Sequence, residues 1–132
     1  MTLTKYESIS DLIFRTMFSL IFIVGGLGHF GEADLMTSRF DASPWADLVR
    51  SIGDPQLMLS ISGVVLALGG LLILIGYKTR LAALCLFVTL VAITFVIHIA
   101  PGHVGPLLKN VALLGGLIHF YVRGAGAYSL DK

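Results

Sequence analysis

Residues 9–30 read ISDLIFRTMFSLIFIVGGLGHF, an apolar run that ends in Gly25-Gly26-Leu27-Gly28-His29-Phe30. A helix needs about 20 mostly apolar residues to cross the hydrocarbon core of a bilayer. Three further runs of this kind follow, at residues 57–76, 81–100 and 106–122. None of the four alternates with period two, and lipid admits only helices or closed barrels. The sequence therefore predicts an all-α membrane protein, one domain over residues 1–132, folded as an antiparallel four-transmembrane-helix bundle.

The composition supports this class. Hydrophobic residues make up 56% of the chain and charged residues 13%, against about 25% charged residues in soluble domains. The net charge of +1 gives no reason to expect a nucleic-acid partner, so membrane lipids are the expected surroundings. Glu7 lies before the first run and Asp11 near its start, and no small-x-small cleavage site follows the run, which predicts a retained helix instead of a cleaved leader.

The first connection, residues 31–56, contains a predicted short amphipathic helix. Ser43 and Pro44 form a typical cap and first-turn pair, apolar residues then recur at helical spacing from Trp45 onward, and Gly53 ends the helix. We expect it to lie on the outer surface with Trp45 at headgroup level. A helix packed across the mouth of the bundle is an equally compatible interpretation.

The distribution of Lys and Arg predicts the orientation. One side of the predicted bundle has six of these residues and the other has three. The larger set is Lys5, Arg15, Lys78, Arg80, Arg123 and Lys132, and the smaller set is Arg39, Arg50 and Lys109. Because positive residues favour the cytoplasm, the bias predicts a bacterial-type inner membrane protein with both termini cytoplasmic.

Small residues mark the expected packing faces. Glycine pairs at 25–26 and 115–116, and a stripe in the second run, would let membrane helices approach closely. The stripe consists of Ser60, Gly63, Ala67 and Gly70. The same residues could instead serve an interface between copies of the chain.

Polar residues inside lipid are costly and usually face an interior or a cavity. The predicted topology brings one group of them to the outer membrane level, near Glu32 and Asp34. This group consists of His29, His98, His103, Lys109 and Asn110. Arg15 and His119 fall at the inner level, so the two similar segments that end in His29 and His119 cannot share one site. We expect Arg15 and His119 to be structural or lipid-facing.

The outer group suits a quinone or a small anion. A histidine can donate and accept a proton near neutral pH, and a lysine can hold an anion or a carbonyl oxygen. We predict His98 as proton donor or hydrogen-bond partner, Lys109 as anchor, and His29 and Asn110 as the remaining walls of the site. The alternative is that each residue snorkels to the interface or bonds nearby backbone. No motif specifies a metal site, and a haem between His29 and His98 is a weaker alternative.

Several segments in order resemble the DoxX family of small four-helix membrane proteins. They are Gly25-Gly26-Leu27-Gly28-His29, Gly76-Tyr77-Lys78-Thr79-Arg80, His98, Lys109-Asn110, and the tail from Gly124 to Asp131. The resemblance implies a redox-linked membrane subunit, since the related DoxD and DoxA subunits are associated with thiosulfate:quinone oxidoreduction. Many members have an acidic residue in the second helix, whereas this chain has apolar and small residues around Leu66. That difference favours a binding or subunit role over direct quinone reduction.

The sequence is also compatible with two other classes of function. The protein could be a non-catalytic scaffold or anchor that forms homo-oligomers or docks a partner in a larger membrane complex. It could also transport a small solute, which requires a polar path across the bilayer. Besides apolar residues, however, the middle of the second and third runs has only Ser, Thr and Gly.

Overall fold

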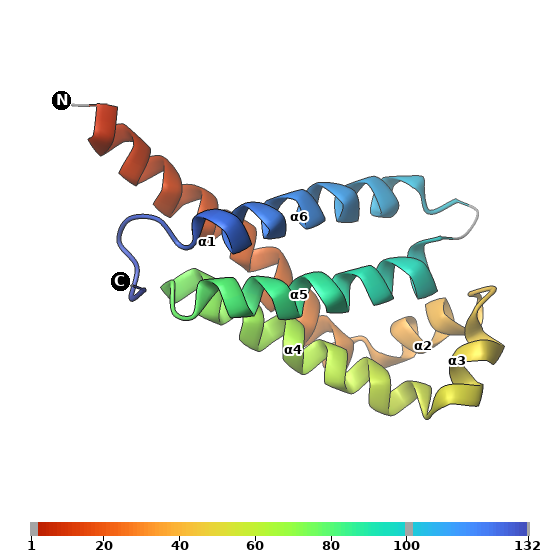
Figure 1. Cartoon of the computed structure of the whole chain (residues 1–132). Coiled ribbons are helices and arrows are strands. Elements are labelled where there is room, and N and C mark those ends of the chain that lie inside the picture. Colours follow the sequence, from red (N-terminus) through yellow and green to blue (C-terminus); the bar gives the residue numbers. More distant parts are fainter. Residues whose placement is uncertain (1–2, 100–101, 132) are drawn as a thin grey trace.

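Figure 1 shows the computed structural model of the chain, in which residues 3–99 and 102–131 are described. These residues form helices and no strand. The helices are α1 (Leu3–Gly31), α2 (Ala33–Asp41), α3 (Ala46–Ile52), α4 (Pro55–Ile75), α5 (Thr79–Ile93), the π-helical turn η1 (Thr94–His98) and α6 (Val104–Arg123). Four segments are long and apolar enough to span a membrane: Thr4–Gly31, Pro55–Ile75, Thr79–His98 and Val104–Arg123. The predicted all-α architecture with four spans is confirmed.

The helix boundaries differ from the predicted ones by a few residues, and local contacts explain two of them. The first helix begins at Leu3 instead of residue 9, because two polar turns continue it beyond the apolar run (Figure 1). Helix α4 starts at Pro55, where the Asp54 carboxylate accepts the Gln56 N–H at 3.2 Å. It ends at Gly76, whose φ of 66° reverses the chain. The predicted end of the third run, residue 100, lies outside the described residues.

The first connection holds two helices instead of one. The amphipathic helix exists as α3, and it ends before Gly53 as predicted. Ser43 is not its N-cap, however, because the helix starts only at Ala46. The Ser43 hydroxyl accepts the Trp45 N–H and donates to the carbonyl of Val96, so it ties this connection to η1. Helix α2 was not predicted, because it has only nine residues and no side chain caps its N-terminus.

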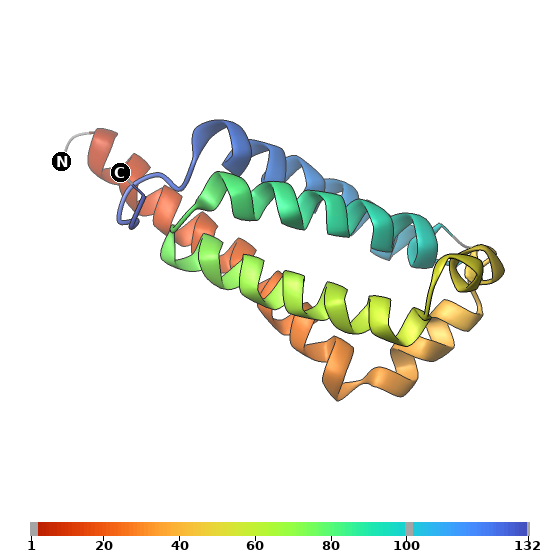
Figure 2. The same cartoon turned by 60° about the horizontal axis from the view of Figure 1, so that its bottom comes forward.

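The bundle has two chemically different ends. Both described ends of the chain and the α4–α5 turn lie at one end, called here the terminal end (Figures 1 and 2). Helices α2 and α3 and the α5–α6 connection lie at the other, called the loop end. Helix α1 packs along α4, α4 along α5, and α5 along α6. Side chains of Phe18, Phe22, Leu86 and Leu117 belong to the buried core between them.

Some of the small residues pack as expected and others do not. A Cβ on Gly26 would lie 2.5 Å from the backbone of Ala67, so α1 and α4 touch at this point. A Cβ on Gly116 would lie 2.3 Å from the Phe18 ring. Gly25 and Gly115, in contrast, have nothing within 4 Å of such an atom. The prediction that both members of each glycine pair serve packing within the bundle is therefore wrong for Gly25 and Gly115.

Arg15 connects α1 to α4 and to the C-terminal tail at the terminal end. Its side chain is 1% exposed and donates four hydrogen bonds to backbone carbonyls. The acceptors are Leu74 at 3.2 Å, Ala125 at 2.7 Å, Ala127 at 3.0 Å and Tyr128 at 2.6 Å. Of the two roles proposed for Arg15, the structural one is therefore the one that its contacts support.

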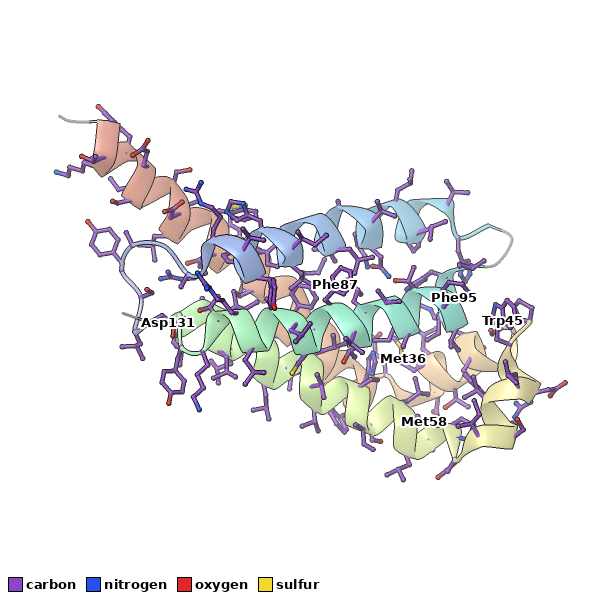
Figure 3. The ribbon with its side chains drawn as sticks, in the orientation of Figure 1. Met36, Trp45, Met58, Phe87, Phe95 and Asp131 are labelled. Carbon is purple, nitrogen blue, oxygen red and sulfur yellow. The ribbon has the colours of Figure 1, made fainter. Side chains whose placement is uncertain are left out.

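Asp131 fastens the end of the same tail (Figure 3). Its carboxylate accepts the backbone N–H of Lys78 at 2.7 Å and of Thr79 at 2.9 Å, where α5 begins. Burial acts to raise the pKa of Asp131, but hydrogen bonds from Thr79 and Lys78 and the charge of Arg15 outweigh it. The pKa of this carboxyl therefore lies below its ordinary value, and the tail is held in its charged form.

Candidate functional site

A cavity of about 390 Å³ lies at the loop end, between α1, α2, α4, α5, η1 and α6. We call it the loop-end cavity. Its lining comprises Ile21, Phe22, Gly25, His29, Met36, Arg39, Leu66, Leu90, Ile93, Ile97, His98, His103, Pro106, Lys109, Asn110 and Leu113. Its volume lies within the range of small-molecule sites, about 300–1,000 Å³. Apolar side chains form most of the wall, and a small set of polar groups joins them.

The polar residues that the topology predicts to lie together are found at this cavity. His29, His98, His103, Lys109 and Asn110 all line the cavity, so the structure brings the predicted group together. Glu32 and Asp34 are exposed and do not line it. Arg15 and His119 lie at the terminal end, where the exposed His119 packs edge-on against Phe14 with ring centroids 5.9 Å apart.

Asn110 fixes α6 to η1 at the wall of this cavity. It is 2% exposed, and its Nδ2 donates to Thr94 Oγ1 at 3.0 Å. The Thr94 hydroxyl donates in turn to the Leu90 carbonyl at 2.6 Å. The wider π-helical turn is closed by the bond from Ile99 N–H to the Thr94 carbonyl at 3.0 Å. Such turns interrupt α-helices frequently at functional sites, and this one carries His98 at its end.

His29 and His103 each have one ring nitrogen committed to the backbone. His29 Nδ1 lies 2.9 Å from the Leu59 carbonyl, and His103 Nδ1 lies 3.0 Å from the Ile97 carbonyl. A carbonyl can only accept, so we assign the proton of both neutral rings to Nδ1. Ser62 Oγ also lies 3.0 Å from His29 Nδ1. The Nε2 atoms of His29 and His103 are then hydrogen-bond acceptors.

His98 differs from both of them. Its Nδ1 is buried and has no hydrogen-bond partner among the described residues. A buried N–H without an acceptor is costly, so the favoured neutral tautomer places the proton on Nε2. His98 is therefore the histidine of the cavity that offers a donor from a neutral ring. Its ring lies 5.9 Å, centroid to centroid, from that of His103.

Two cations, Arg39 of α2 and Lys109 of α6, lie at the edge of the cavity. Both residues are exposed, and neither forms an ion pair with a described residue. No carboxylate belongs to the lining. Within residues 3–99 and 102–131, no three His, Cys, Asp or Glu side chains are placed to hold a metal ion. Because its edge has two cations and its lining has no carboxylate, the cavity can bind an anion or a carbonyl oxygen there.

Arg39, Met36 and Gly25 were not predicted as site residues. Arg39 and Met36 come from α2, and Figure 3 shows Met36 pointing from this helix toward the bundle. Met36 and Phe40 are four residues apart, with Arg39 beside them on the same side of a helix. That spacing is the sequence signal that could have revealed both α2 and its contribution to the site.

A second hollow, the apolar groove, lies between α3, α4 and α5 and measures about 400 Å³. It is lined by Phe40, Val49, Ile52, Pro55, Met58, Leu59, Ile61, Ser62, Val65, Val88, Thr89, Ala92, Ile93, Val96 and Ile97. Its polar side chains are Ser62 and Thr89, and it has no charged group. It can hold an acyl chain but offers no cation to a polar head group.

Comparisons with known proteins agree with this architecture. The DoxX family model matches residues 10–99. The chain is 32% identical to the inner membrane protein YqjF of Escherichia coli, with 97% of this chain and 94% of that protein covered. It is 30% identical to a Haemophilus influenzae protein over 98% of this chain and 94% of that protein. It is 25% identical to the "Putative oxidoreductase CatD" of Bacillus subtilis, over 98% and 90% of the two chains. No solved structure matches.

Proposed function

Because this chain belongs to the DoxX family of membrane proteins, we propose that it is a redox-linked membrane subunit that binds a quinone head group in the loop-end cavity. The observation that supports this proposal most strongly is the chemistry of the cavity. Hydrogen-bond donors from His98 and Lys109 lie beside an apolar wall that includes Phe22 and Leu66. A quinone combines two carbonyl oxygens with an apolar ring, and so it matches both parts.

The residues have different roles in this proposal. Lys109 anchors one quinone oxygen through a charge-assisted hydrogen bond. His98 donates a hydrogen bond to the other quinone oxygen through Nε2 and stays neutral, because loss of that proton would leave an imidazolate. Reduction to the hydroquinone takes two electrons, which a partner oxidoreductase subunit supplies, and two protons, which reach the rim from water. The printed name of the Bacillus relative includes the word oxidoreductase, which agrees with a redox role but identifies no substrate.

The proposed location is the bacterial-type inner membrane, with the loop end outside and both termini in the cytoplasm. The six-to-three bias of Lys and Arg supports this orientation. The Escherichia coli relative is named an inner membrane protein, which supports the location.

A small anion is the second candidate ligand. Arg39 and Lys109 place two cations without ion-pair partners at the edge of the loop-end cavity, and its lining contains no carboxylate. Such a site favours negative charge. The anion and quinone proposals share Lys109, but they differ in whether the apolar wall contributes to affinity.

The scaffold and transport alternatives have less support. Gly26, Gly63 and Gly70 are already in contact with other helices of the same chain, so they are not free for a second copy. Gly115 remains open and is the proposed contact of a homo-oligomer. A transport path would have to pass the buried side chains of Phe22 and Leu66 at the base of the cavity.

Purification with native lipids followed by mass spectrometry of the bound small molecules tests the proposal. We expect a co-purifying quinone that is lost in the His98→Ala/Lys109→Ala double variant. The His119→Ala variant is the matched control, because His119 lies at the terminal end, and it should retain the quinone. A wild-type protein that carries no quinone and co-purifies with a stoichiometric partner protein would support the scaffold function instead.

A further inference from the structure

The loop-end cavity lies between α1 and α6, which line it with Gly25 and His29 on one side and Lys109 and Leu113 on the other. These two helices touch in the half near the terminal end, where the Phe18 ring packs against Gly116 and the Phe14 and Phe120 rings stack with centroids 5.3 Å apart. Toward the loop end, α1 instead follows α4 and diverges from α6, as Figures 1 and 2 both show. The part of the loop-end cavity between α1 and α6 therefore lies within the segments long and apolar enough to span the membrane.

The cavity is polar at one end and apolar at the other. On α1 it extends from His29 at the loop end to Ile21 deeper in the bundle. Eight residues of helix correspond to about 12 Å along the axis. The charged and imidazole groups lie at the loop end, whereas Leu113 of α6 and Leu90 of α5 line the deeper part together with Ile21. This gradient matches a ligand with a polar head toward the loop end and an apolar tail toward the bilayer centre.

Gly25 lies in the α1 wall halfway between these two ends. It is four residues from both Ile21 and His29, so all three share one face of the helix. Gly25 is exposed, and a Cβ at this position would meet nothing within 4 Å. No neighbouring helix fills the space beside Gly25. We therefore take this position as the opening of the cavity toward the bilayer.

We propose that the ligand of the loop-end cavity is a lipid-soluble molecule with an apolar tail, which enters from the bilayer between α1 and α6 past Gly25. The inference rests on the proposed function for the identity of the head group, which is a quinone. Gly25 determines specificity in this account, because it leaves room for the tail where any larger side chain would narrow the gap. A water-soluble anion that arrives from the loop end has no need of this opening.

The test compares two quinones and three proteins in lipid nanodiscs. One quinone has a ten-carbon chain and the other has the same head group without a chain. The proteins are wild type, Gly25→Leu and the matched control Gly28→Leu. Gly28 is also on α1 with nothing within 4 Å of a Cβ, but it does not line the cavity. Both substitutions replace a helical glycine by a better helix former, so the fold should tolerate them.

We expect Gly25→Leu to weaken binding of the ten-carbon quinone at least tenfold and that of the tailless quinone less than twofold. Gly28→Leu should bind both quinones like the wild type. Equal weakening of both quinones by Gly25→Leu, or no weakening of either, would overturn the lateral entrance and leave the head-group site intact. Absence of binding of both quinones by the wild type would overturn the proposed function itself. An Ile21→Trp variant, which narrows the gap from the neighbouring turn, should reproduce the pattern of Gly25→Leu.

Discussion

The two ends of the bundle use their polar groups differently. At the terminal end, Arg15 is surrounded by four carbonyl acceptors and Asp131 by two N–H donors. At the loop end, His98 has a buried nitrogen without a partner, and Arg39 and Lys109 have no ion pair with a described residue. Polar groups that are fully bonded stabilise the fold, whereas polar groups left beside a cavity are available to a ligand.

The two ends therefore differ in what their residues determine, which is stability at the terminal end and ligand binding at the loop end. Changes at the terminal end should lower the stability of the protein and leave the affinity of the folded protein for a quinone unchanged. Changes to the loop-end groups without a bonding partner, His98 and Lys109, should lower the affinity and leave the stability nearly unchanged. Each prediction below tests one side of this division.

The largest effect is expected for Arg15→Leu. The substitution leaves four backbone carbonyls without their donor, and we expect a loss of about 3 kcal/mol in the free energy of unfolding. Thermal unfolding in detergent measures it, with Arg15→Lys as the control that keeps the charge and part of the hydrogen bonding. An Arg15→Leu protein as stable as the wild type would contradict the structural role of this side chain.

Lys109→Met should weaken quinone binding about 10- to 100-fold. A charge-assisted hydrogen bond contributes about 1.5–3 kcal/mol, and each 1.4 kcal/mol is a factor of ten in affinity. The thermal stability should stay close to that of the wild type, because Lys109 is exposed. Lys5→Met is the matched control, since Lys5 is an exposed lysine outside the cavity, and it should leave the affinity unchanged.

The pair His29→Leu and His98→Leu distinguishes a bonded histidine from an unbonded one. His29→Leu removes the hydrogen bond to the Leu59 carbonyl and should cost about 1 kcal/mol of stability or more. His98→Leu removes a ring whose buried nitrogen has no partner, and the stability should remain the same or rise. Both variants are compared by thermal unfolding, and a larger loss for His98→Leu would reverse our assignment of the two residues.

The smallest effect is expected for Asp131→Asn, about 1 kcal/mol, similar to the loss of a helix cap. The pKa of Asp131 is lowered in the folded protein, so its contribution is present above the unfolded carboxyl pKa near 3.9. It is lost as the pH falls through the lower pKa of the folded state. The difference in unfolding temperature between wild type and Asp131→Asn should therefore shrink between pH 5 and pH 3 or below, and a constant difference would contradict this linkage.

The sequence was sufficient to predict the four spans and the meeting of the loop-end residues at one end of the bundle. Apolar run length determines the spans, and topology alone places His29, His98 and Lys109 at one end. Helix α2 was missed because it has nine residues and no side-chain N-cap, so that only the spacing of Met36, Arg39 and Phe40 indicates it. The sequence also could not predict the acceptors of Arg15, since carbonyl groups belong to every residue and no side-chain pattern identifies them.

The central claim is that a quinone occupies the loop-end cavity and not the apolar groove. Photolabelling with a radioactive azidoquinone that carries a ten-carbon chain, followed by mapping of the labelled peptides, tests it most directly. We predict labelling of residues 21–29 and 97–113, and competition by unlabelled quinone. Labelling confined to residues 49–65 and 88–89, which contribute to the apolar groove and not to the loop-end cavity, would contradict the claim.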